Sequence, residues 1–226
     1  VSGSAANPSI GGITIGKGGN SSMSGNTALG LNALFTNSSG NHNTAVGSNA
    51  LQINSTASNN TAVGSLALQG NAVGLNNTAV GYNSLNDNDA SDNTAVGSNA
   101  LQANQGGTDN TAVGSNALFT NSSGLNNTAV GSNALQANDI GTDNTALGYN
   151  SLKINTAINN TAVGSNALQA NQVGTDNTAV GSNALFTNST GLNNTAVGSR
   201  ALFTNFAGNN NTAVGYNSLN VNDAGD

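Results

Sequence analysis

One pentapeptide, Asn-Thr-Ala-Val-Gly with Leu in place of Val in two copies, recurs twelve times along the chain at intervals of 16 or 17 residues. Self-similarity at a short fixed period is typical of stacked structural units, each of which contacts mainly its neighbours. The repeat therefore predicts a solenoid over residues 26–226. The twelve units begin at Asn26, Asn43, Asn60, Asn77, Asn93, Asn110, Asn127, Asn144, Asn160, Asn177, Asn194 and Asn211.

The unit that begins at Asn110 serves as the reference coil, and each set of equivalent residues is named as a column after its member in that coil. Constancy within a column indicates that every copy has the same surroundings, whereas the variable stretch 122–126 has the composition of a loop. Six columns hold one residue type in all twelve units, those of Asn110, Thr111, Ala112, Gly114, Leu118 and Asn121.

The residue types in the repeat favour strands over helices, because Thr, Val, Asn and Gly are poor helix formers. We expect one short strand at 110–113 and a second at 117–119, with Gly114 making the corner between them. Val113 and Leu118 are the large apolar columns, so we place them inside together with Thr111, and Ala112 outside. The fold class predicted is an all-β parallel β-solenoid of twelve coils, with stacked Asn amides adding inter-coil hydrogen bonds.

The sequence also has a longer repeat, which consists of four coils. The two 16-residue spacings follow the units that carry Tyr82 and Tyr149, which we expect to plug the shortened coils. The chain thus divides into three modules of four coils, at 26–92, 93–159 and 160–226. Residues 1–25 do not fit the repeat and are expected to form an N-terminal leader or cap, with one short strand between Ile10 and Gly16.

The charge and the rare residue types exclude several function classes. The net charge is −6 with only three cationic side chains, which disfavours nucleic-acid binding, and no apolar run is long enough for membrane insertion. There is no Cys, one His (His42), one Arg (Arg200) and no Glu, so neither a catalytic cluster nor a cofactor site is expected, and we predict that the protein is not an enzyme. The densest oxygen-ligand group, Asp87-Asn88-Asp89, is interpreted as a solvated turn and not as a metal site.

Aromatic side chains recur in the column that follows the constant Leu, which alternation places away from the interior. Large apolar side chains are informative on a surface that is otherwise small and polar. Burial under a loop or against a sister chain is one reading of this column, and a contact with a host-surface glycan or protein is the other. The possible contact residues are Phe35, Phe119, Phe186 and Phe203.

The order Asn-Thr-Ala-Val-Gly followed by Asn-Ala-Leu resembles the repeats in the heads of trimeric autotransporter adhesins, which are left-handed parallel β-rolls. It also resembles the repeats of bacteriophage tail fibres, and the resemblance covers residues 26–226. The resemblance implies an extracellular location, on a cell-surface appendage or a virion fibre, and assembly into a homotrimer.

A physical argument also favours self-association. One Val and one Leu per coil contribute roughly 3–6 kcal/mol on burial, whereas ordering 17 residues costs about 1–2 kcal/mol each in backbone entropy. A sister chain would supply further burial, and the small Ala column, with Ala95, Ala112 and Ala129 among its members, is expected at the contact. The partners predicted are therefore other copies of the chain, in a parallel homotrimer with end-to-end stacking as a second mode.

These observations favour a structural fibre or adhesin segment, acting as a rigid spacer or as a head that presents a binding surface. The alternative is an ice-binding solenoid that uses its twelve aligned Thr residues. Two points weigh against the alternative: each coil supplies a single constant Thr, and alternation puts that Thr on the same face as the expected core Val.

Overall fold

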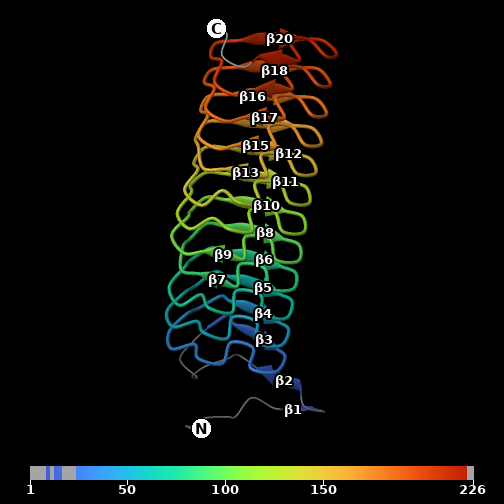
Figure 1. Ribbon diagram of the computed structural model, residues 1–226. Coiled ribbons are helices and arrows are strands. Elements are labelled where there is room, and N and C mark those ends of the chain that lie inside the picture. The colour runs from blue at the N-terminus through green and yellow to red at the C-terminus, as the bar shows by residue number, and fades with distance from the viewer. Residues whose placement is uncertain (1–8, 11–12, 17–23, 223–226) are drawn as a thin grey trace.

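The structure, a computed structural model, describes residues 9–10, 13–16 and 24–222. These residues form a rod of stacked coils with strands and turns but no helix, as Figure 1 shows. The coils follow one another from the N-terminal to the C-terminal end without a break in the stack. The expected parallel β-solenoid of about twelve turns is confirmed.

One wall of the rod is a 14-stranded sheet in which the Thr-Ala-Val segments of the twelve coils pair in parallel and in register. Thr111, for example, lies between Thr94 and Thr128. The same-residue pairing follows from the repeat, because a shift by one residue would turn every side chain to the other face. The twelve strands are β3 (Thr27–Leu29), β4 (Thr44–Val46), β5 (Thr61–Val63), β6 (Thr78–Val80), β8 (Thr94–Val96), β10 (Thr111–Val113), β11 (Thr128–Val130), β12 (Thr145–Leu147), β14 (Thr161–Val163), β16 (Thr178–Val180), β18 (Thr195–Val197) and β20 (Thr212–Val214).

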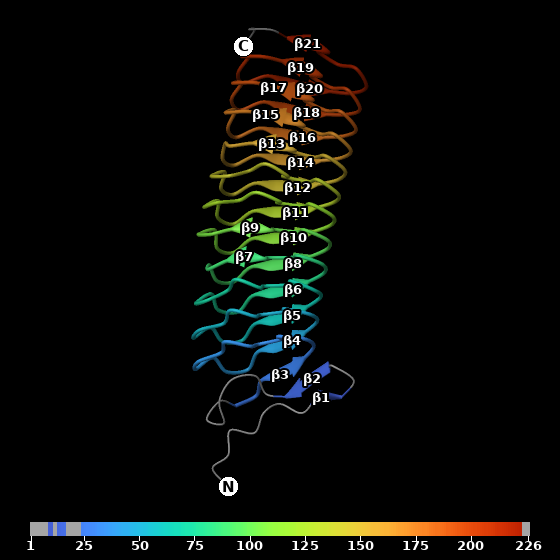
Figure 2. The same ribbon diagram turned by 60° about the horizontal axis from the view of Figure 1, so that its bottom comes forward.

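A second, thinner wall consists of two-residue parallel strands that end at the constant Asn121 column. Figure 2 shows its two parts, β7 and β9 in one and the strands from β13 to β21 in the other. Single bridges at Thr120 and Ala137 connect them. The strands of this wall are β7 (Asp87–Asn88), β9 (Ala103–Asn104), β13 (Ile154–Asn155), β15 (Ala170–Asn171), β17 (Thr187–Asn188), β19 (Thr204–Asn205) and β21 (Val221–Asn222).

The region before the repeat contributes two strands where the sequence predicted one. β1 (Ser9–Ile10) pairs antiparallel with β2 (Ile13–Gly16), and β2 pairs antiparallel with β3. β2 thereby covers the edge that the first coil would otherwise leave unpaired. Most of the expected leader or cap at 1–25 lies outside the described residues.

The sequence prediction placed Thr111 and Val113 inside and Ala112 outside, and this prediction is wrong. The Ala112 column points inward and Ala112 is fully buried, whereas Thr111 and Val113 point outward and are partly exposed. The placement of Leu118 inside is confirmed, and it packs with Ala112 and Ala117 in one continuous apolar core. The core therefore consists of Leu and two small side chains per coil, Ala or Ser in the Ala117 column.

The strand predicted at 117–119 is also wrong, because this segment is a turn. Asn116 and Leu118 both adopt positive φ, 54° and 48°, which L residues other than Asn and Asp rarely do. The two residues send their N–H groups in opposite directions, Asn116 to Ser98 of the preceding coil and Leu118 to Ala134 of the next. Burial of Leu118, which contributes about 1.5–3 kcal/mol, offsets a strain of about 1–2 kcal/mol.

Gly114 makes the corner after the strand, as expected. Its φ is 135°, and a Cβ at this position would lie 2.6 Å from the carbonyl O of Gly131 in the next coil. Only Gly fits, since both the backbone conformation and the space exclude a side chain.

Two buried Asn columns join the walls. Asn110 and Asn121 both donate from Nδ2 to the carbonyl O of Gly124, at 2.9 and 2.8 Å. Asn110 Oδ1 accepts from the backbone N–H of Asn127 in the next coil at 2.9 Å, and Asn121 Nδ2 also donates to Asn104 Oδ1 of the preceding coil at 2.9 Å. The expected stacking of Asn amides is thus confirmed. In the described part of the chain, these Asn residues close the coils at the corner opposite Gly114.

The two shortened coils lose their residue in this same corner. Asn88 reaches the carbonyl of Ala90 and Asn155 reaches that of Ala157, two residues on, where Asn121 reaches three residues on to Gly124. The bond is 2.8 or 2.9 Å in all three coils. A coil of 16 residues therefore closes in the same way as one of 17.

The assignment of faces makes a prediction that separates Leu118 from Val113. Leu118→Ala should lower the free energy of unfolding by about 2–5 kcal/mol, because it opens a cavity in the core. Val113→Ala should lower it by less than about 1 kcal/mol, since that side chain faces outward. Urea denaturation followed by circular dichroism measures both, and a Val113 loss as large as that of Leu118 would contradict the structure.

Candidate functional site

The most regular exposed surface of the rod is the outer face of the 14-stranded sheet. We define the Thr–Val face as the outward columns of Thr111 and Val113. No member of either column is buried, and Val63, Val96 and Val180 are 36–37 % exposed. The larger Leu29 and Leu147 occupy the Val position in two coils. A row of methyl groups beside a row of hydroxyls therefore runs along the rod.

The hydroxyls of the Thr–Val face are free of protein partners. Within residues 24–222, no hydrogen bond joins a hydroxyl of the Thr111 column to another protein group, whereas loop hydroxyls such as those of Thr36 and Thr108 are bonded. These Thr residues therefore present both a donor and an acceptor to solvent.

The face carries no charge, because its two columns contain only Thr, Val and Leu. Carboxylates occur near its margin in the column of Asn126. The column of Asn126 immediately precedes the buried Asn110 column and adopts positive φ in every described coil, for example 59° at Asp109 and 56° at His42. It contains only Asn, Asp, Gly and His, so left-handed geometry accounts for its composition. The sequence prediction grouped this column with the loops. The restriction of the column to four residue types was the signal that could have indicated the left-handed corner.

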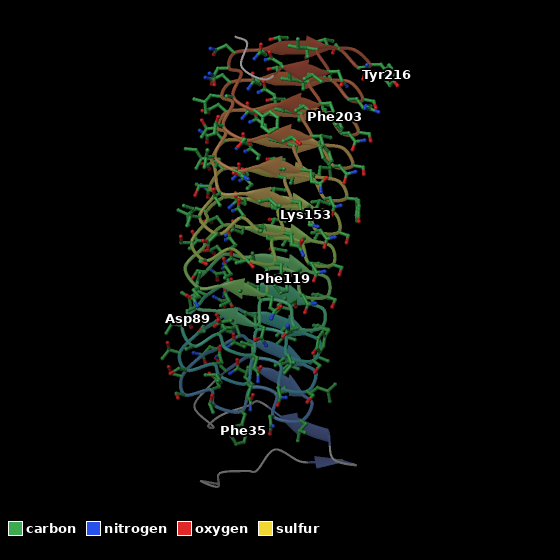
Figure 3. The ribbon with its side chains drawn as sticks, viewed as in Figure 1. Phe35, Asp89, Phe119, Lys153, Phe203 and Tyr216 are labelled. Atoms are coloured by element: carbon green, nitrogen blue, oxygen red, sulfur yellow. The ribbon has the colours of Figure 1, made fainter. Side chains whose placement is uncertain are left out.

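The predicted Phe residues lie on the other wall and do not come together at one place. Phe35 in the first coil is 67 % exposed, whereas Phe119, Phe186 and Phe203 are half-buried. Figure 3 shows Phe119 and Phe203 spaced along the same side of the rod, with Lys153 of the same column between them. The column is thus a line of separate apolar positions rather than a pocket.

Phe186 and Phe203 are neighbours in this line, in successive coils. Their rings stack with centroids 5.0 Å apart and planes at 10°, and the Arg200 guanidinium carbon lies 4.9 Å from the Phe203 centroid. Stacking and a cation–π contact stabilise this end of the rod and occupy faces of the rings that a glycan would use. Of the four candidates, Phe35 and Phe119 have no aromatic residue of this column in an adjacent coil.

The Tyr residues do not plug the shortened coils. Tyr82, Tyr149 and Tyr216 are 56, 54 and 78 % exposed and belong to the Ser115 column beyond the Gly114 corner. The deletion that shortens the coils lies in the opposite corner. Tyr216 projects from the edge of the rod in Figure 3.

The remaining polar residues form no chemical centre. Asp87 lies in the strand β7 and not in the expected turn, and Asp89 follows that strand. Both are exposed on either side of the buried Asn88, and His42 is an exposed corner residue. Within the described part of the chain, no group of three or more His, Cys, Asp or Glu side chains is placed to hold a metal ion. In the same residues, no helix is long and apolar enough to cross a membrane.

The aromatic stack predicts coupling between its members. In a double-mutant cycle, Phe186→Ala and Phe203→Ala should show an interaction free energy of about 0.5–1.5 kcal/mol. The matched cycle of Phe119→Ala with Phe203→Ala should be additive, because these rings are several coils apart. Urea denaturation measures all variants, and additivity in the first cycle would contradict the stack.

Comparison of the chain with protein-family models, with curated proteins and with solved structures found no match.

Proposed function

We propose that the chain is a structural segment of an extracellular fibre or adhesin, on a cell-surface appendage or a virion fibre. In this role it is a rigid rod that presents the same outer surface at every coil. The observation that carries the proposal is the register: along the 14-stranded sheet from β3 to β20, Thr pairs with Thr, Ala with Ala, and Val with the Val or Leu at the same position of the next coil. A stack built on identical contacts sets length and direction, which are the properties that a spacer or display scaffold needs.

The residue content supports a role without catalysis. General acid–base and nucleophilic chemistry require clustered titratable groups, and the sequence offers one His, one Arg and nine Asp. In the described part of the chain, the Asp residues other than Asp87 of β7 occur in corners and loops, where they contribute charge and solubility to a surface rich in Ser, Thr and Asn.

Self-association into a parallel homotrimer is part of the proposal, but the contact predicted from sequence is wrong. Ala95, Ala112 and Ala129 are fully buried within their own chain, so a sister chain cannot reach them. We assign the contact to the Phe column instead, because aromatic residues are enriched at interfaces. Phe35 and Phe119 are its members that have no stacked neighbour.

The assembly proposal predicts a mass of three times 22.0 kDa by light scattering. Phe119→Gln should shift the mass towards that of one chain while leaving the fold intact, because Gln102 and Gln136 occupy the same column in the adjacent coils. Ala substitution at the exposed Ser115 serves as the control. A wild-type mass of 22.0 kDa would contradict the homotrimer.

The spacer role predicts that length changes in units of the module. Deleting residues 93–159 removes four coils and joins Asp92 to Asn160, which restores the normal corner. The rod should shorten by about 19 Å, four coil rises, and keep a cooperative unfolding transition. Small-angle scattering and thermal melting measure these two properties.

A half-coil deletion is the matched control for the module deletion. Removing residues 110–118 destroys one coil, takes Leu118 out of the core and separates Asn121 from the Asn110 with which it closes the coil. This deletion should therefore destabilise the rod far more than the module deletion, although it removes fewer residues. If the module deletion unfolds the protein, or if it abolishes a binding activity that the half-coil deletion retains, the spacer proposal is wrong.

A further inference from the structure

We propose that the Thr–Val face binds ice, with the hydroxyls and methyl groups of its twelve coils holding water in a lattice-like layer. The inference rests on the proposed rod function, because it names the ligand of a surface that the rod presents. Two points weighed against ice binding in the sequence: each coil supplies one constant Thr, which remains so, and that Thr shares a face with a Val expected in the core. In the structure Thr111 and Val113 do lie on the same face of the strand, but that face points to solvent and not to the core.

Register gives the face its order. The strands of adjacent coils pair Thr to Thr throughout, and Val to Val except at Leu29 and Leu147, which pair with Val. β10, for example, pairs in this way with both β8 and β11. The spacing along the rod is about 4.8 Å per coil, and Thr and Val of one strand are about 6.6 Å apart. The face is thus a two-dimensional grid with two fixed repeats, and a crystal surface is a ligand that repeats in the same way.

The groups on this grid match the chemistry of a water lattice. Each Thr carries a hydroxyl that can both donate and accept, and these hydroxyls make no hydrogen bond to protein groups within residues 24–222. The Val methyl groups and the Thr methyl group give the water beside them no competing partner, so it hydrogen-bonds to other water. Neither column contains a charged or aromatic residue.

The Thr column is constant although packing does not require it. Exposed columns elsewhere in the coil vary: the Ser115 column contains Ser, Leu and Tyr, and the Leu125 column contains Leu, Ile, Thr, Ser and Asn in the described coils. A general preference for strand residues would admit Val, Ile or Tyr in place of Thr. The identity of all twelve Thr residues instead fits a ligand that contacts every coil.

Two other occupants are less consistent with the face. A crystalline polysaccharide also repeats, but its sugar rings stack on aromatic side chains, and the aromatic residues of this rod lie in other columns. A second copy of the chain would bury the Val column, but the hydroxyls of the Thr column would then lose water without gaining the partners that a buried hydroxyl needs. Ice supplies a partner to each hydroxyl and leaves the methyl groups in contact with ordered water.

The test compares one bulky substitution on the face with the same substitution beside it. Thr111→Tyr places a ring in the middle of the grid. Ser115→Tyr is the control, because Tyr82 and Tyr149 already occupy its column and show that the fold accepts Tyr there. Both variants and the wild type are checked by circular dichroism, and thermal hysteresis and partition of labelled protein into growing ice are then measured.

The wild type and Ser115→Tyr should show thermal hysteresis and enter ice, and Thr111→Tyr should lose most of the hysteresis, several-fold below the control. A folded wild type that neither depresses the freezing point nor enters ice would overturn the proposal. An equal loss of thermal hysteresis in both variants would also overturn it. So would a wild type that shows no hysteresis but binds insoluble cellulose or chitin, if Thr111→Tyr abolishes that binding. None of these outcomes changes the rod length after module deletion, so failure of ice binding is distinguishable from failure of the spacer role.

Discussion

The hydrogen bonds from Asn110 and Asn121 to the carbonyl of Gly124 are the constraint on which the rest of the structure depends. Both amides are buried, and an unpaired buried amide costs about 1–3 kcal/mol, so these Asn residues must lie inside and must meet at one corner. Once Asn110 points inward, strand alternation places Ala112 inside and Thr111 and Val113 outside. The same bonds close coils of 16 and 17 residues, which explains why the length of the loop can vary.

The repeat was sufficient to predict a parallel stack, the Gly114 corner, the inward Leu118 and the stacked amides. It was not sufficient to orient the strand, because Val113 is more apolar than Ala112 and size alone favoured Val for the core. The interior is narrow and is filled by Leu118 between two small columns, so hydrophobicity gave the wrong face. The constant Asn110, which shares a face with Ala112, was the better signal, because a column that must pair its amides indicates the inside.

The turn at Leu118 shows a second limit. A Leu with φ near 48° contradicts its local preference, and only burial together with the N–H bond to the next coil stabilises it. No pattern within one unit indicates such a conformation. By contrast, the Asn, Asp, Gly and His of the Asn126 column are the residue types that left-handed corners favour. The left-handed conformation of that column could therefore have been predicted from the sequence. The candidate Phe residues lie outside the core, as alternation predicted, but the more ordered Thr–Val face was assigned to the core.

The same orientation supports both proposals, since a rod that completes its core within one chain is free to use its outer columns for binding. The absence of Cys from the sequence allows a direct test of the orientation by single Cys substitutions. The account predicts that Cys at Thr111 and Val113 reacts with a thiol reagent at once in native buffer, whereas Cys at Ala112 reacts only after unfolding. Rapid reaction at Ala112 together with protection at Val113 would contradict it.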